Sequence, residues 1–138
     1  MTRLVASAVV TPRWNQIEVQ DLESQDTPEW ETGDEKVVAG PGCLLIGTID
    51  DTDGTVTVDL RVGPVDVPGV TVVHEGLLSC PSGIVSVNSP CTSRKPTLRL
   101  PRAGDWRVTV AVSGAGLPDY VGVFFREEEW DAGSGAAG

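Results

Sequence analysis

The sequence predicts an all-β protein, a single-domain two-sheet antiparallel β-sandwich with one core. Apolar and polar residues alternate with a period of two, β-branched residues are abundant, and blocks rich in Ala, Leu, Glu and Lys are missing. The chain also has 16 Gly and 10 Pro, most of them at the joints between the alternating segments. Roughly nine short strands at a spacing of about 8–12 residues, with a turn-forming sequence at each break, are typical of a sandwich or barrel.

Three segments show the alternation most clearly. Gly54–Gly63 places four aliphatic side chains on one face, and Asp105–Gly114 does the same with Trp106 and three valines. In Asp119–Glu127, aromatic residues and glycine alternate with valines and a phenylalanine. The other candidate strands are shorter: Arg3–Val10, Gln16–Val19, Lys36–Ala39, Leu44–Ile49, Val70–Leu78, Ile84–Val87 and Thr97–Leu100.

Two connections have the composition of hairpin turns. Ile49–Gly54 contains three aspartates and ends in Asp-Gly, and Ser113–Asp119 is rich in Gly and Pro. The aspartates also suggest calcium, but aligning Gly54 with the sixth position of an EF-hand loop puts Ile49 and Leu60 at the first and last ligand positions. We therefore expect an acidic hairpin turn at Ile49–Gly54 in preference to a metal site.

Length and composition fit one domain. The chain has 138 residues and a mass of 14.5 kDa. We expect one β-sandwich over residues 1–130 and a flexible Gly- and Ala-rich tail over 131–138. No apolar run approaches the ~18 residues of a membrane-spanning helix. The apolar stretch Leu4–Val10 is at the lower limit for a signal peptide and fits a first strand better, so the expected location is cytoplasmic.

The cysteines are Cys43, Cys80 and Cys91, and their odd number argues against a disulfide framework. We expect reduced thiols in a cytosolic protein, although Cys80 and Cys91 could pair across a loop in an oxidising compartment. A zinc site is disfavoured, because the sequence has no C-x-x-C pair and His74 stands alone. The expectation is that the protein holds no metal and no other cofactor.

Charge and motifs disfavour two classes of function. A net charge of −10 and a pI of about 4.3 have the wrong sign for a protein that binds the phosphate backbone of nucleic acids. His74 is followed by Glu75, but adjacent residues of a strand point to opposite faces and do not readily form a base–carboxylate pair. The sequence has neither a G-x-S-x-G element nor a phosphate-binding glycine loop. We therefore expect a protein that is not an enzyme.

The acidic residues concentrate in two blocks, and each block contains a tryptophan. Residues 18–35 include no Lys or Arg, and the second block is Glu127–Asp131. A tryptophan within a charged rim has the composition of a protein-binding hot spot. The predicted partner-binding residues are Glu23, Asp26, Glu29, Trp30, Glu31, Asp34, Glu35, Glu128, Glu129 and Trp130.

Two other interpretations of these blocks stay open. The acidity could serve only solubility, because like-charged surfaces keep small proteins dispersed. Alternatively, Trp30 and Trp130 could fold back and cap the open ends of the sandwich. Trp14 and Trp106 lie within or beside strand patterns, so we expect them to pack in the core or at the end of a sheet.

A short element of the C-terminal half resembles a known family. Leu100-Pro101 followed by Gly104, Trp106-Arg107-Val108 and Val110 forms an LP-x-x-G-x-[WY]-R-V-x-V pattern. Together with the strands around it, over Ile84–Glu127, this pattern is similar to that of small bacterial β-sandwich proteins such as the inhibitor of the competence DNA-uptake nuclease. The resemblance implies an acidic protein of the inhibitor or immunity type, and it carries no catalytic residue.

The resulting hypothesis is a non-enzymatic binding protein whose acidic surface engages a basic partner protein such as a nuclease. Acidic complementarity would accelerate association and reject wrong partners. No direct contact with nucleic acid or with a membrane is expected. The alternatives are an accessory β-sandwich that stacks a small ligand or glycan on an exposed tryptophan, an enzyme with an unrecognised site around His74, and a structural subunit of a phage or secretion apparatus.

Overall fold

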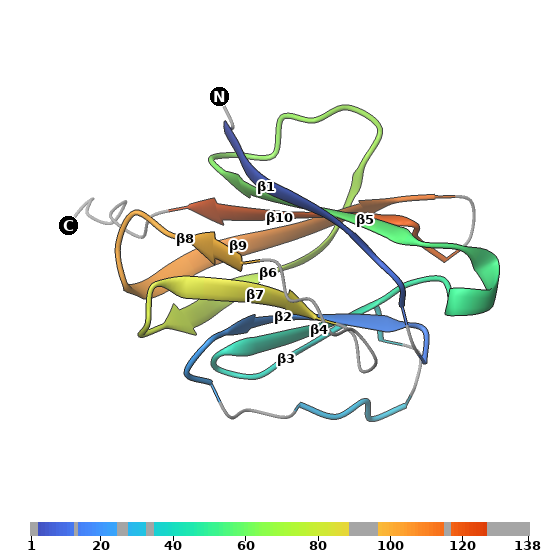
Figure 1. Cartoon of the computed structure of the whole chain (residues 1–138), viewed down its shortest axis with the longest axis horizontal. Coiled ribbons are helices and arrows are strands. Elements are labelled where there is room, and N and C mark those ends of the chain that lie inside the picture. Colours follow the sequence, from blue (N-terminus) through green and yellow to red (C-terminus); the bar gives the residue numbers. More distant parts are fainter. Residues whose placement is uncertain are drawn as a thin grey trace.

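The computed structural model describes residues 3–12, 14–24, 28–32, 35–88, 97–114 and 117–126. In these ranges the chain forms ten strands and one short 3-10 helix, arranged in two packed sheets (Figure 1). The prediction of an all-β two-sheet sandwich is confirmed. The strands are β1 (Arg3–Val10), β2 (Gln16–Asp21), β3 (Val37–Ala39), β4 (Cys43–Gly47), β5 (Val56–Val62), β6 (Thr71–Cys80), β7 (Ile84–Asn88), β8 (Thr97–Arg99), β9 (Gly104–Ser113) and β10 (Tyr120–Arg126).

Each sheet has five strands. The first sheet has the order β1-β5-β10-β9-β6 and the second the order β3-β4-β2-β7-β8. All pairings are antiparallel except that of β5 with β10, in which Thr57 lies opposite Tyr120 and the strands run in the same direction. The edges of the sheets are therefore β1 and β6 in the first and β3 and β8 in the second. Within the described ranges, no helix is long and apolar enough to cross a membrane.

The core lies between the sheets and is built from the apolar faces that the alternation predicted. Val56, Val58 and Leu60 of β5 are buried against the second sheet, and so is Trp106 of β9. The indole of Trp106 meets the ring of Phe125 edge-on, with 6.4 Å between the ring centroids. Its Nε1–H donates to the carbonyl of Arg102 at 3.1 Å, so burial leaves this polar group satisfied. The expectation that Trp106 packs in the core is confirmed.

The two predicted hairpins had different outcomes. Ser113–Asp119 does join the antiparallel neighbours β9 and β10. The prediction of a hairpin at Ile49–Gly54 is wrong, because β4 belongs to the second sheet and β5 to the first. This connection crosses between the sheets through a 3-10 helix, η1 (Asp51–Asp53). An Asp-Gly turn reverses the chain locally, but the sheet that the next strand joins depends on where its apolar face is buried.

The expectation for Trp14 is also wrong. Its side chain is 73% exposed, and it occupies the turn that connects β1 to β2. Trp14 and Asn15 have φ angles of 56° and 58°, the left-handed pair of a tight reversal. In this conformation the indole leaves both sheets and does not reach the core.

Candidate protein-binding surface

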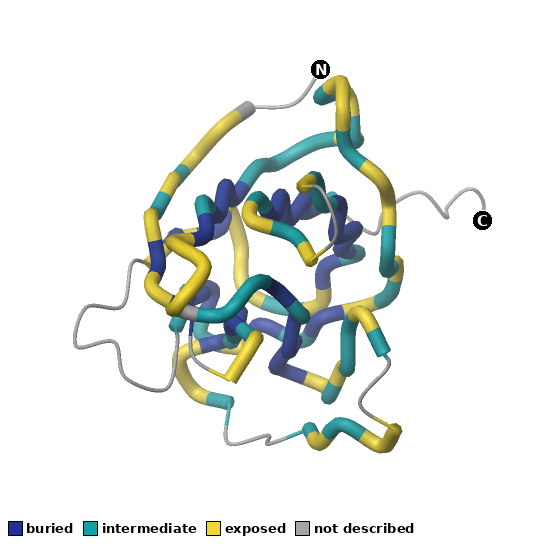
Figure 2. Tube along the Cα trace, turned by 90° about the vertical axis from the view of Figure 1, so that its right-hand side faces the viewer, coloured by how far each residue is buried: buried dark blue, intermediate teal, exposed yellow. Residues whose placement is uncertain are grey.

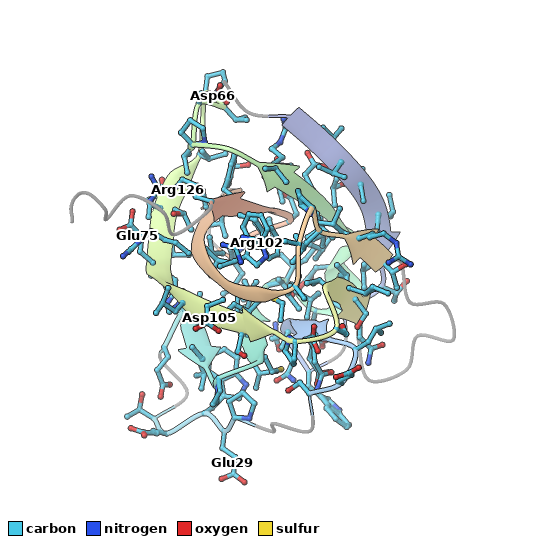
Figure 3. All side chains as sticks on the ribbon, turned by 90° about the vertical axis from the view of Figure 1, so that its left-hand side faces the viewer. Glu29, Asp66, Glu75, Arg102, Asp105 and Arg126 are labelled. Atoms are coloured by element: carbon cyan, nitrogen blue, oxygen red, sulfur yellow. The ribbon has the colours of Figure 1, made fainter. Side chains whose placement is uncertain are left out.

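The predicted acidic surface lies on the connection from β2 to β3, along the lower side of the molecule in Figure 1. Glu23, Glu29 and Glu31 are exposed, and Figure 3 shows Glu29 projecting away from the sandwich. Trp30 and Glu35 are half-buried. The other predicted partner-binding residues lie outside the described residues: Asp26, Asp34, Glu128, Glu129 and Trp130.

Trp30 attaches this acidic segment to the second sheet. Its Nε1–H donates to Oε1 of Gln16, the first residue of β2, at 2.8 Å. The Cη2 atom of the indole lies 3.9 Å from the point that a Cβ on Gly47 would occupy, so the ring covers the glycine at the end of β4. The structure thus agrees with the alternative in which Trp30 folds back onto the sandwich, and only part of the side chain is exposed to solvent.

Glu35 organises the turn that precedes β3. Its carboxylate accepts hydrogen bonds from the backbone N–H of Glu31 at 2.8 Å and from the backbone N–H and hydroxyl of Thr32. Backbone N–H groups, first that of Glu35 itself and then that of Glu31, stabilise the charged form and lower the pKa of Glu35 to about 2. Glu35 therefore acts mainly within the turn, whereas Glu29 and Glu31 present their carboxylates to solvent.

We expect the carboxyl carbon of Glu35 to titrate in NMR spectra with a midpoint near pH 2, well below the ordinary value of 4.5. Because the folded-state pKa is depressed, the turn is stabilised fully above pH 4.5, and this stabilisation is lost as the pH falls through about 2. Glu35→Gln should remove this acid transition and broaden the amide resonances of Glu31 and Thr32 at neutral pH. A midpoint near 4.5 in the folded protein would contradict the hydrogen-bonded turn.

The outer face of the first sheet carries a polar network that sequence reasoning missed. Asp59 of β5 is only 8% exposed. Its carboxylate accepts hydrogen bonds from the Ser7 hydroxyl at 2.6 Å, the Tyr120 hydroxyl at 2.9 Å and, more weakly, the Arg61 guanidinium at 3.4 Å. The network ties together β1, β5 and β10. The alternation placed Asp59 on the polar face, but no local pattern indicated partners so distant along the chain.

The network predicts a raised pKa for Tyr120, the only tyrosine of the chain. Burial raises this pKa above 10.0, and the hydrogen bond and negative charge of Asp59 raise it further. Asp59→Asn should therefore lower the midpoint of the tyrosinate absorbance titration. Since the folded-state pKa is raised, the associated stability is present below pH 10.0 and is lost as the pH rises through the folded-state value. An identical midpoint in the Asp59→Asn variant would contradict the 2.9 Å contact.

His74 does not form a base–carboxylate arrangement with Glu75. Its imidazole is half-buried over Gly76, with Nε2 3.2 Å from the point that a glycine Cβ would occupy. Glu75 is exposed at the outer side of β6 (Figure 3). Burial lowers the pKa of His74, and the charge of Glu75 opposes this effect only in part. This is the environment of a packed strand histidine.

The cysteines and acidic residues suggest no metal centre in the part of the chain that the structure describes. Cys43 and Cys80 are buried, and Cys91 lies outside the described residues. Burial, with the nearby charges of Asp21 and Asp105, raises the pKa of Cys80 to about 12, so its sulfur stays protonated and unreactive. No group of three His, Cys, Asp or Glu side chains in the described ranges could hold a metal ion.

Comparison with known proteins gives two likenesses, both at the level of structure. No family model matches the sequence, and no curated protein matches it. One similar solved structure is that of ComJ, the inhibitor of the DNA degrading activity of NucA from Bacillus subtilis. The two structures match with a TM-score of 0.73 and a sequence identity of 12%, over 92% of this chain and 98% of the ComJ chain. The product of crocagin biosynthetic gene J is also similar, with a TM-score of 0.63 and 15% identity, over 93% and 99% of the two chains.

These likenesses extend the resemblance that the sequence suggested. The LP-x-x-G-x-[WY]-R-V-x-V pattern covered only the C-terminal half, whereas the structural match covers more than nine-tenths of the chain. At identities of 12% and 15% the comparison shows a shared fold. The chain thus has the two-sheet sandwich fold of ComJ and of the crocagin gene J product.

Proposed function

We propose that this chain is a non-enzymatic, inhibitor-type protein that binds a basic partner protein, a nuclease, through its acidic surface. The observation that carries the proposal is the sandwich shared over almost the whole length of both chains with ComJ, an inhibitor of a DNA-degrading activity. Fold alone does not specify function. The charge of the chain provides the second, independent support.

The electrostatics favour a basic protein as the partner. The chain has a net charge of −10, and Glu23, Glu29 and Glu31 are exposed on one connection without a neighbouring Lys or Arg in sequence. A nuclease cleft is basic because it must hold a phosphate backbone, so an acidic surface can occupy the same path as DNA. Such complementarity accelerates association and rejects acidic or neutral partners.

The test is inhibition of DNA degradation. Fractions of host-cell lysate that degrade linear duplex DNA are separated, the purified chain is added, and the remaining nuclease activity is measured. We expect stoichiometric inhibition of one fraction, by a complex that survives size-exclusion chromatography. If no DNA-degrading fraction is inhibited, the proposed function is wrong.

A matched pair of variants tests the role of charge. Glu29→Gln with Glu31→Gln should slow association with the inhibited nuclease and reduce the dependence of the association rate on salt. The control is Glu75→Gln with Asp105→Asn, which removes the same charge from exposed positions of β6 and β9 (Figure 3). Equal association rates for the two double variants would mean that only net charge matters and that the acidic segment is not at the interface.

A further inference from the structure

The largest exposed apolar side chain of the described residues is that of Trp14, which is 73% exposed at the turn between β1 and β2. Single exposed apolar residues are common on protein surfaces, but a tryptophan with most of its side chain exposed to solvent is unusual. A second exposed apolar side chain, that of Leu117, is 54% exposed in the connection between β9 and β10. The strand ends that flank these two connections lie at the right-hand end of the molecule in Figure 1, the end that Figure 2 views directly.

Backbone hydrogen bonds show that these two turns adjoin each other. The N–H of Thr48 donates to the carbonyl of Asn15 at 3.0 Å, and the next N–H, of Ile49, donates to the carbonyl of Pro118 at 2.9 Å. The β1–β2 turn and the β9–β10 connection therefore lie on two sides of the same short segment after β4. We name this the Trp14 end, and it consists of Trp14, Asn15, Thr48–Asp53 and Leu117–Asp119.

The backbone holds Trp14 in a defined position. Its φ angle of 56° is one that bulky side chains rarely adopt, whereas Asn15 tolerates the same region. Asn15 is fixed by its side-chain N–H, which donates to the carbonyl of Thr48 at 3.3 Å, and by its backbone N–H, which donates to Asp50 at 3.4 Å. A side chain presented on a fixed turn loses little conformational freedom when a partner binds it.

The described residues at the rim of the Trp14 end are acidic, and Arg13, which precedes Trp14 in the sequence, lies outside the described residues. Asp53 and Asp119 are exposed and Asp50 is half-buried beside the turn. The sequence has no Lys or Arg between residues 37 and 60. An aromatic centre with a charged rim has the composition of a protein-binding hot spot, and the sign of this rim fits a basic protein.

The Trp14 end also adjoins the acidic segment described above. Trp30 of that segment bonds to Gln16, which follows Asn15 directly in the chain. Gln16 in turn pairs with Gly47, the residue before Thr48. The two regions therefore meet at Gln16 and Gly47.

We propose that Trp14 is the apolar anchor of the partner contact, inserting into an apolar pocket on the basic partner protein while the flanking carboxylates meet its positive rim. This assignment rests on the proposed function, since it names the surface through which that partner would be bound.

The first test is the dissociation rate of the complex with the nuclease inhibited in the preceding experiment. Trp14→Asn removes the indole and introduces a residue that accepts the left-handed conformation, so the fold should be as stable as the wild type or more so. We expect dissociation at least tenfold faster, with little change in the salt dependence of association. The matched control is Leu77→Ser, because Leu77 is 52% exposed on β6, a different edge of the first sheet. It should dissociate at the wild-type rate.

The second test does not depend on knowing the nuclease. A benzophenone amino acid at position 14 or 117 should cross-link in host lysate to one basic protein, and the same group at position 77 should not. If the wild type inhibits a nuclease but the complex of Trp14→Asn with this nuclease dissociates at the wild-type rate, the assignment of Trp14 as the anchor is wrong. The proposed function is then still supported. If no nuclease is inhibited, the proposed function is wrong, and the cross-linked protein is purified. The Trp14 assignment is then supported only if this protein is basic and dissociates at least tenfold faster from Trp14→Asn than from the wild type.

Two further outcomes would overturn the anchor assignment. A homodimer of this chain that Trp14→Asn dissociates in sedimentation experiments would mean that a second copy covers the surface. Binding of the wild type to a glycan array, lost in Trp14→Asn, would mean that the indole stacks on a sugar. Absence of selective cross-links from positions 14 and 117 would likewise reject the proposal.

Discussion

Trp106→Ala is expected to lower the free energy of unfolding by about 3–5 kcal/mol, as is usual when a large aromatic side chain is removed from a core. Trp106 is completely buried on β9 and packs edge-on against Phe125 of the neighbouring strand. Its hydrogen bond to the Arg102 carbonyl would also be lost, and the Arg102 guanidinium, 4.6 Å from the ring centroid, would lose its cation–π contact. Urea unfolding followed by circular dichroism measures the change.

The control is a second tryptophan with the opposite environment. Trp14→Asn removes the same indole from a solvent-exposed turn, and it should leave the free energy of unfolding unchanged or increase it. The free energy of unfolding of Trp106→Phe should lie between those of the wild type and of Trp106→Ala. A loss below about 1 kcal/mol for Trp106→Ala, within the range of ordinary substitutions, would contradict the described core.

Asp21→Ala should lower the free energy of unfolding by about 3 kcal/mol, because it leaves three part-buried donors without their acceptor. Asp21 ends β2 and is only 1% exposed. Its carboxylate accepts hydrogen bonds from the Ser82 hydroxyl at 2.7 Å, the Ser82 backbone N–H at 3.3 Å and the Glu23 backbone N–H at 2.9 Å. The side chain therefore fastens the turn between β6 and β7 to the end of β2.

A double-mutant cycle with Ser82→Ala separates this contact from other effects of the substitution. The two single variants should be strongly coupled, with an interaction energy of about 1 kcal/mol or more, because both remove the 2.7 Å hydrogen bond between these side chains. Glu23→Ala is the exposed control and should change stability by less than about 0.5 kcal/mol. Additive effects of Asp21→Ala and Ser82→Ala would contradict the contact.

Most strands were predictable from local sequence, because several of them alternate, as β5 and β9 do, and others are short apolar segments such as β4. The segments expected from sequence coincide with the ten strands to within a few residues, and glycine or proline marks most of their ends. The alternation of β10 nevertheless predicted two faces without showing that both are buried. Phe124, on the face away from the core, is completely buried and lies over Gly122, where a Cβ would come within 2.9 Å of the ring.

What could not be predicted depends on contacts between distant parts of the chain. The parallel pairing of β5 with β10, the placement of β4 and β5 in different sheets, and the network around Asp59 all join segments far apart in sequence. The acidic segment was recognisable from composition, but the hydrogen bond from Trp30 to Gln16 was not. The exposure of Trp14 was missed because its neighbours form a strand pattern, whereas its own backbone forms the turn.

The position of β10 has a consequence for how the protein is made in the cell. β10 is the last of the ten strands to be synthesised, yet it lies at the centre of the first sheet, between β5 and β9. Until it emerges from the ribosome, both of these strands have an unpaired backbone edge. A nascent chain should therefore remain open to chaperones until Arg126 has left the ribosome, and messages truncated before the codons of β10 should yield products that are degraded or aggregate.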